Sequence, residues 1–294
     1  MTTKHAIQLV ARGPRVVRDE GNLPREALVP FVRYVLRRDG EYVDDARHFP
    51  AARANARELT VEYEADHRDP FWIAKGPHVH AIFAAPSMMA VLYEIAGPRP
   101  ILAMPTTELL LVAKASADPR HLLEAATHAY TEADDDDRLS PMLYVLQKDV
   151  LAPLHLPAEH PLADAVARAH RRLAFDVYNE QKDHYEDNFD ELEPIEEAFW
   201  ASTLDISGKN KARNWTASVW SEGLDTLLPE TELVIFKPEG GAPIVVRWED
   251  VFSVLGSDAP PVFDTVDPPR YRALASRWPS ADQIAALRAA SISI

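Results

Sequence analysis

The sequence predicts an α+β protein of two domains, each an antiparallel sheet of hairpins packed with helices. Short apolar stretches bounded by proline, glycine and aspartate indicate strands, and amphipathic stretches of helical period lie between them. Strands resume after an acidic stretch, which indicates a second domain. We expect an N-terminal domain over residues 1–186, an acidic linker over 187–205 and a C-terminal domain over 206–294.

The N-terminal domain is expected to begin with short elements. Alternating apolar residues predict a strand over 58–65, and the apolar stretch at 70–75 predicts another. Residues 28–39 fit either a helix or a strand, because Pro30 interrupts a helix unless it lies in the first turn. Helical spacing predicts a short buried helix over 86–95.

Two strand pairs and two helices follow. The apolar runs within 100–114 predict a β-hairpin with Pro105 early in its turn. An amphipathic helix is expected over 118–133, and a strand pair hinged near Lys148 over 141–156.

The longest helical pattern covers residues 162–186 and closes the first domain. Its apolar residues recur at helical spacing, while three arginines lie away from them. The apolar face holds Val166, Ala169, Leu173 and Val177, and the arginines are Arg168, Arg171 and Arg172.

The C-terminal domain restarts with three strands, over 214–220, 231–237 and 242–248, and Pro-Glu-Gly-Gly joins the last two in a hairpin. A short helix is expected before Gly256. The proline-rich stretch that follows is expected to be a loop or an extended arm, and a helix capped by Ser280 closes the chain.

Nearly the same phrase occurs twice, as PTTELLLVAK from Pro105 and as PETELVIFK from Pro229. The flanking sequences share little, which argues against a duplication. We interpret the phrase as a recurrent hairpin, in which the prolines preset the turn and Thr107 and Thr231 bond the local backbone.

Four stretches occur in a familiar order: VPFVR (29–33), PILAMPTTELLLVAK (100–114), LLEAATHAY (122–130) and LSPMLYVLQKDVLAPLHL (139–156). In this order they resemble the YtpQ-like family of bacterial cytosolic proteins, in which an apolar strand leads into a VP-x-x-D turn, an apolar strand and a helix. Glu108 stands where the family usually has Asp. The resemblance covers roughly residues 25–160 and implies no activity for any residue.

Composition excludes several classes of protein. The chain has no cysteine, which rules out disulfides, thiolate metal sites and cysteine nucleophiles and indicates a reducing cytoplasm. The net charge is −15, and residues 131–200 hold 6 Lys and Arg against 18 Asp and Glu. Because an acidic surface repels phosphate backbones, we expect no nucleic-acid partner. No apolar run reaches the ~20 residues of a bilayer span, so we expect no membrane partner.

Histidines provide the candidate metal ligands. His78 and His80 are two residues apart, a spacing that turns both rings to one face of a strand but separates them on a helix. His121 and His128, seven residues apart on one helix face, are candidates for a third ligand. Ordinary polar positions beside buried elements are the competing interpretation.

Other motifs in the sequence lack residues that the corresponding binding sites require. The four aspartates at 134–137 are interpreted as a solvated turn, and the acidic stretch from Glu186 lacks the glycine of a calcium loop. Gly208-Lys209 lacks the remaining residues of a phosphate-binding loop. No G-x-S-x-G, G-x-G-x-x-G or HExxH motif occurs, and no cofactor is predicted.

Two tryptophans and a basic loop form the candidate binding surface. Trp215 and Trp220 are five residues apart, so on a strand they face opposite sides, which allows one to be buried and the other exposed. The neighbouring basic residues are Lys209, Lys211 and Arg213. Core anchors and a solvated loop are the competing interpretation.

These features favour a non-enzymatic protein-interaction, regulatory or immunity-type module that binds another protein, possibly a basic one. The reasons are the missing catalytic motifs, the acidic middle of the chain and the aromatic residues of the second domain. The alternative is a metal-dependent hydrolase that uses His78 and His80. The sequence leaves the oligomeric state open.

Overall fold

The computed structural model describes residues 8–12, 26–29, 31–39, 41–58, 66–68, 71–76, 79–187, 200–201, 205–207, 215–263 and 268–293. The chain forms two compact units, Met1–Leu173 and Ala174–Ile294, and the division between them falls inside one long helix. Both units contain helices and sheets, which confirms the α+β class. Residues 59–65 and 188–199, which include most of one predicted strand and most of the predicted linker, lie outside the described residues.

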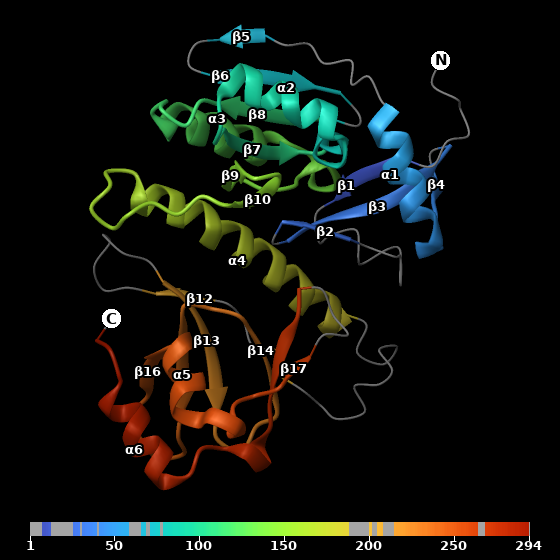
Figure 1. The fold of residues 1–294 in the computed structure, drawn as a ribbon. Helices are drawn as coiled ribbons and strands as arrows, with labels where there is room; N and C mark the ends of the chain where they lie inside the picture. The colour runs from blue at the N-terminus through green and yellow to red at the C-terminus, as the bar shows by residue number, and fades with distance from the viewer. Residues whose placement is uncertain are drawn as a thin grey trace. The chain divides into compact units, whose positions relative to one another are not determined.

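The first unit contains a small antiparallel sheet of order β1-β3-β2, with β4 beside β3 (Figure 1). Residues 28–39, which fitted either a helix or a strand, form parts of two strands. Phe31 has a φ of 65° and turns the chain between them. The strands are β1 (Gln8–Arg12), β2 (Glu26–Val29), β3 (Val32–Arg38) and β4 (Glu41–Tyr42).

The larger sheet of this unit has six antiparallel strands in the order β10-β9-β7-β8-β6-β5. It contains the predicted hairpin of β7 and β8 and the predicted strand pair of β9 and β10. Lys148 and Asp149 both have positive φ, 50° and 61°, as the two-residue turn between β9 and β10 requires. The strands are β5 (Asp66–Arg68), β6 (Phe71–Lys75), β7 (Ile101–Thr106), β8 (Leu109–Ala113), β9 (Leu143–Gln147) and β10 (Val150–Pro153).

The turn of the β7–β8 hairpin differs from the prediction. Pro105 lies within β7, where the pairing with β8 shifts register, and the turn consists of Thr107 and Glu108. Because proline has no N–H to donate, it is tolerated where the ladder is interrupted. Thr107 bonds a neighbouring loop instead of its own backbone, since its Oγ1 donates to Asp137 Oδ1 at 3.0 Å.

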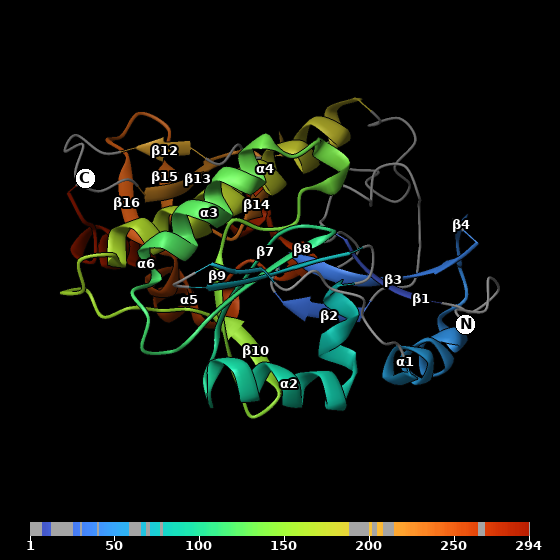
Figure 2. The ribbon, with the colours of Figure 1, turned by 90° about the horizontal axis from the view of Figure 1, so that it is seen from above.

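Helices cover both faces of the larger sheet (Figure 2). Ile101 and Ala103 of β7 pack against residues of α3 and α4, whereas Leu102 and Met104, which alternate with them, are buried on the opposite face of the sheet. This alternation is what a strand buried on both sides requires. The helices are α1 (Phe49–Glu58), α2 (Pro86–Ala96), α3 (Pro119–Glu132) and α4 (Ala163–Asp187), and the 3₁₀ turns are η2 (Ala46–His48), η3 (Val79–Ala84) and η4 (Asp135–Asp137).

The predicted helices at 86–95, 118–133 and 162–186 are thus confirmed within a few residues. One prediction about α4, the exposure of its arginines, was wrong in part. Arg168 and Arg172 are exposed as expected, but Arg171 is buried with 8% of its surface accessible. A long side chain can place its aliphatic stem against the core while its charged end finds partners, so helical position alone does not fix its exposure.

The second unit contains two four-stranded sheets, of orders β11-β14-β18-β17 and β12-β13-β15-β16. Each includes a parallel pair, β11 with β14 and β13 with β15, so the unit is not built from hairpins alone as predicted. The strands are β11 (Trp200–Ala201), β12 (Asp205–Ser207), β13 (Trp215–Ser221), β14 (Thr226–Pro229), β15 (Leu233–Lys237), β16 (Ile244–Arg247), β17 (Val262–Phe263) and β18 (Arg270–Ala273).

Two further predictions for this unit were wrong. Pro229 ends β14, which belongs to one sheet, and β15 belongs to the other, so the second P-x-T-E-L phrase is a crossing between sheets and not a hairpin turn. The proline-rich stretch is also not only a loop, because β18 within it pairs with β14. In contrast, Thr231 does bond its local backbone, donating from Oγ1 to the Leu233 carbonyl at 2.7 Å.

The core of the second unit lies between the β13–β15–β16 strands and two helices, α5 (Trp248–Leu255) and α6 (Ala281–Ala289). Trp220 is fully buried, with its ring centroid 5.3 Å from that of Phe236 and 5.6 Å from that of Trp278. The predicted cap of α6 is present as a capping box between Ser280 and Gln283. The remaining 3₁₀ turns are η5 (Gly256–Asp258) and η6 (Ala275–Arg277).

A buried arginine connects β18 to the second half of α4. Arg270 has no accessible surface, and its guanidinium donates to the carbonyl oxygens of Leu227 at 3.0 Å and Tyr178 at 2.8 Å. Its Nε donates to the side-chain oxygen of Gln181. These acceptors satisfy the buried charge, which otherwise costs several kcal/mol or more.

Candidate binding groove between helices α3 and α4

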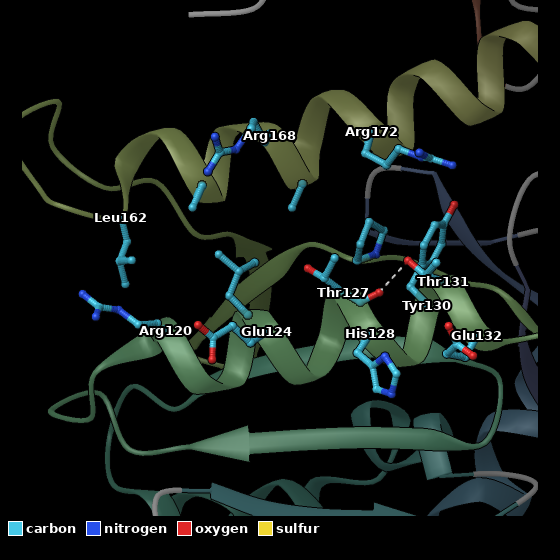
Figure 3. Close-up of a pocket in the computed structure, with 14 residues that line it drawn as sticks. Arg120, Glu124, Thr127, His128, Tyr130, Thr131, Glu132, Leu162, Arg168 and Arg172 are labelled. Atoms are coloured by element: carbon cyan, nitrogen blue, oxygen red, sulfur yellow. Dashed lines mark hydrogen bonds between the residues drawn. The ribbon is translucent and has the colours of Figure 1, made fainter. Parts of the chain in front are cut away.

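A groove of about 790 Å³ lies between helices α3 and α4 of the first unit. Both helices pack on one face of the larger sheet, through Leu122 and Ala126 of α3 and Val166 of α4. Figure 3 shows the two helices side by side, with lining side chains on both of them. The volume is that of an ordinary ligand pocket, for which about 300 to 1,000 Å³ is typical.

Small side chains keep the groove open. Thr127 and Thr131 are one turn apart on α3, and Ala165 and Ala169 repeat the same spacing on α4. Thr131 Oγ1 donates to the Thr127 carbonyl at 2.9 Å, so this hydroxyl is bonded within its own helix (Figure 3). Because none of these side chains extends far from its helix, the two walls do not close on each other above the sheet.

The bottom of the groove is apolar. Leu123 of α3 and Leu162, just before α4, have 7% and 8% of their surface accessible, and Ala169 has 7%. Tyr130 and Pro141, which are also buried, complete this surface. A ligand that fits here must therefore offer apolar groups to the bottom of the groove.

Arginines from both helices line the edges: Arg120 of α3, and Arg168 and Arg172 of α4 (Figure 3). All three are exposed. In the part of the chain that the structure describes, the guanidinium groups of Arg120 and Arg168 make no hydrogen bond or ion pair. Their positive charges are therefore available to a ligand.

Two acids and a histidine also line the groove: Glu124, Glu132 and His128. Oε2 of Glu124 lies 3.5 Å from Nδ1 of His121, one turn earlier on α3. With three arginines against two glutamates, the lining carries one net positive charge when histidine is neutral. The groove is thus a cationic site on a chain whose net charge is −15.

Both ends of α3 are fixed, which holds its wall of the groove in place. At the start, Asp118 accepts a hydrogen bond from the Arg120 backbone N–H at 3.0 Å. At the end, Arg138 donates to the carbonyls of Thr131 at 3.1 Å and Ala133 at 3.0 Å and pairs with Asp135. A cation at a helix C-terminus satisfies carbonyls that have no partner within the helix and interacts favourably with the helix dipole.

The structure does not bring the predicted histidine ligands into one site within the residues it describes. His80 lies in the 3₁₀ turn η3 and not on the strand that the two-residue spacing would need, and His78 lies outside the described residues. Pro77 and Pro86 flank this segment and disfavour a ladder of strand hydrogen bonds. His121 and His128 are exposed on α3.

His80 itself is bonded as a structural residue. Its ring has 1% of its surface accessible, and Nε2 lies 2.7 Å from the Thr106 carbonyl oxygen. Burial lowers the pKa of His80 from 6.5 to about 4, although the bond to Thr106 opposes this. The described residues contain no group of three or more His, Asp or Glu side chains positioned to hold a metal ion. A metal site that includes His78 stays a prediction.

The predicted binding surface of the second unit is only partly described. Lys209, Lys211 and Arg213 lie outside the described residues. Trp220 belongs to the core and cannot contact a partner, whereas Trp215, on the other side of β13, is half-buried. The prediction that the two tryptophans differ in exposure is therefore confirmed, and the surface as a whole stays a prediction.

Sequence reasoning did not identify the arginine groove. Arg168 and Arg172 were placed on the exposed side of α4, but no function was assigned to them, and Arg120 was not considered. One signal was present: the arginines are one turn apart beside Ala165 and Ala169, which have the same spacing. The position of α3 beside them depends on tertiary packing across more than forty residues.

No helix among the described residues combines the length and the apolar character that crossing a bilayer requires. No family model, no curated protein and no solved structure matches this chain.

Proposed function

We propose that this protein is a non-enzymatic protein-interaction module, and that its α3–α4 groove binds an acidic segment of another protein. The observation that carries this proposal is the combination of an apolar bottom with two arginines, Arg120 and Arg168, that have no partner in the described structure. Burial of apolar surface supplies affinity, and the arginines select for carboxylates.

Arginine suits this role chemically. Its planar guanidinium can donate two parallel hydrogen bonds to one carboxylate, and such charge-assisted bonds are about twice as strong as neutral ones. Arg120 and Arg168 come from opposite walls of the groove, so a segment lying between them meets a cation on either side (Figure 3). Arginine is also enriched at protein interfaces and among their hot spots.

The net charge of the protein does not oppose an acidic partner at this site. Met1–Leu173 contains 21 Lys and Arg against 24 Asp and Glu, a net charge of −3, whereas Ala174–Ile294 contains 10 against 22, a net charge of −12. Most of the acidity thus belongs to the unit without the groove. At physiological ionic strength, exposed charges further apart than about 8 Å are largely screened.

This proposal differs from the sequence-based expectation in the charge of the partner. The acidic middle of the chain suggested a basic partner, but much of that acidity lies in residues outside the described structure or in the second unit. The groove itself is lined by arginines. A polypeptide fits it better than a phosphate backbone does, because the bottom of the groove requires apolar side chains from the ligand.

The test compares charge reversal in the groove with charge reversal elsewhere. The double variant R120E/R168E places two acids in the groove, and the double variant R99E/R277E makes the same change at two exposed arginines outside it. Synthetic fluorescein-labelled peptides rich in glutamate and leucine are titrated with each protein, and binding is followed by anisotropy. We expect wild type and R99E/R277E to bind alike and R120E/R168E to lose at least tenfold in affinity.

Equal loss in both double variants would show a general charge effect and would contradict the proposal. The same conclusion would follow if the peptides bound none of the proteins, or if a single-stranded oligonucleotide bound the groove more tightly than they do. The replaced side chains are all exposed, so we expect the fold of each variant to be intact. Circular dichroism of each variant checks this.

A further inference from the structure

The walls of the groove restrict the conformation of any polypeptide bound there. Both walls are α-helices, whose backbone N–H and C=O groups are already bonded within α3 and α4. The hydroxyl of Thr131, at the C-terminal end of α3, is bonded to the carbonyl of Thr127. The groove therefore offers few partners to the backbone of a ligand.

An extended segment would be costly in this groove. Its backbone groups would lose water on the buried side without gaining hydrogen bonds, and a buried polar group without a partner is destabilising. A helix avoids this cost because it bonds its own backbone groups internally. It then presents only side chains to the walls.

The small residues of the walls fit a helical ligand. Packed helices lie about 8 to 10 Å apart, and the smaller distances require small side chains at the contact. Thr127 and Thr131 on α3 and Ala165 and Ala169 on α4 supply these at one-turn intervals. A third helix can therefore place its large apolar side chains over small ones on both sides, which is the ridges-into-grooves arrangement.

The spacing of the arginines matches the spacing of side chains on such a helix, and Arg172 also interacts with a group of the protein itself. Arg168 and Arg172 are four residues apart on α4, about 6 Å along its axis. Carboxylates at positions i and i+4 of a ligand helix repeat at the same interval. Arg120 on the opposite wall adds a third cation near the start of α3. α3 has 14 residues, so a ligand helix of about four turns would span this wall.

From these features we infer that the acidic segment bound by the groove is an amphipathic α-helix, with apolar residues at helical spacing and carboxylates one turn apart. This inference rests on the proposed function, since it specifies the conformation of the ligand at the same site. The binding mode is that of a helix laid into an apolar groove, in which affinity comes from residues at i, i+3, i+4 and i+7.

Two synthetic peptides test the conformation separately from the charge. Both have the length of α3, leucines at helical spacing and glutamates at i and i+4, and the second has proline in place of one central residue on the outer face. Proline inside a helix removes a backbone hydrogen bond and clashes with the preceding turn, so it breaks the helix. We expect the first peptide to gain helical circular dichroism on binding, and the proline peptide to bind at least tenfold more weakly.

A third peptide moves the glutamates to i and i+2 without changing composition, which places them on different sides of a helix. We expect it to bind at least fivefold more weakly than the first peptide and to be less affected by R120E/R168E. If the proline peptide or the i, i+2 peptide binds as tightly as the first, the helical inference is wrong, while the proposed function stands. If no peptide binds, or if R120E/R168E and R99E/R277E behave alike, the proposed function fails as well.

Discussion

Lowering the pH from 7 to 5 should destabilise the first unit through His80. The imidazole is buried, its Nε2 donates to the Thr106 carbonyl at 2.7 Å, and its Nδ1 has no hydrogen-bond partner among the described residues. Protonation would place a charge and an N–H at Nδ1, in a position with neither water nor an acceptor. This is the physical reason that burial lowers the pKa of His80 to about 4.

The size of the effect follows from proton linkage. In the unfolded chain the pKa of His80 returns to about 6.5, so between these values the unfolded state binds more protons than the folded state. Stability is therefore complete above pH 6.5 and is lost as the pH falls toward 4. At pH 5 the loss is about 2 kcal/mol, and below pH 4 it approaches about 3 kcal/mol. Either loss is a large part of the free energy of unfolding of a typical protein, which is about 5 to 15 kcal/mol.

The assay is urea denaturation at pH 7 and pH 5, followed by far-ultraviolet circular dichroism, on wild type and His80→Gln. The glutamine amide can donate to the Thr106 carbonyl in place of Nε2, but it does not titrate. Other groups titrate in both proteins, so their contributions cancel in the comparison. We expect wild type to lose about 2 kcal/mol more than the variant between the two pH values.

His128→Gln is the matched control for the loss of a histidine side chain, because His128 is exposed on α3. The reasoning is refuted if wild type and His80→Gln lose the same free energy between pH 7 and pH 5. It is also refuted if the His80 ring, followed by NMR, takes up its proton near pH 6.5.

Three further predictions concern the second unit. Ser280→Ala removes the capping box of α6 and should cost about 1 kcal/mol in calorimetry, and an unchanged Tm would show that the cap contributes nothing. Trp220→Ala leaves a cavity beside Phe236 and should cost about 3 to 5 kcal/mol; an unaltered near-ultraviolet spectrum would contradict its place in the core. Arg270→Lys replaces a forked donor with a point charge that cannot reach both the Leu227 and Tyr178 carbonyls. It should cost about 2 kcal/mol in urea denaturation, and a loss below about 0.5 kcal/mol would contradict the bonding described.

The helices were predictable because their signals are local. The apolar residues of α3 and α4 recur at helical spacing, and Asp118 and Ser280 mark helix starts by a mechanism that operates within four residues. The turn at Lys148 was found for the same reason. These features depend on neighbours along the chain, which the sequence displays directly.

The errors arose where distant contacts decide the structure. Pro105 has the same local sequence as a turn proline, but it lies within β7, whose pairing with β8 resumes after it at Thr106. Arg171 and Arg172 are adjacent on one helix, yet only packing around α4 determines that Arg171 is buried. The second P-x-T-E-L phrase became a crossing between sheets because β14 pairs with β18, more than forty residues later.

The α3–α4 groove is also a feature that distant contacts decide. Its walls come from helices that are far apart in sequence, and its openness depends on the absence of large side chains at four positions. The arginine pair on α4 was visible as a pattern, but the opposite wall was not. A search for small residues and cations that share one-turn spacing on separate amphipathic helices would have marked α4 as a candidate.

Residues of α4 belong to both units, and this limits where the chain can be cut into separate fragments. Ala169 belongs to the core of the first unit, while the carbonyl of Tyr178 and the side chain of Gln181 accept hydrogen bonds from Arg270 in the second. A fragment that begins at residue 188 would retain the guanidinium of Arg270 without two of its acceptors. Proteolysis or truncation at the acidic stretch should therefore yield a C-terminal fragment that aggregates, whereas a fragment that begins at Ala174 keeps the acceptors.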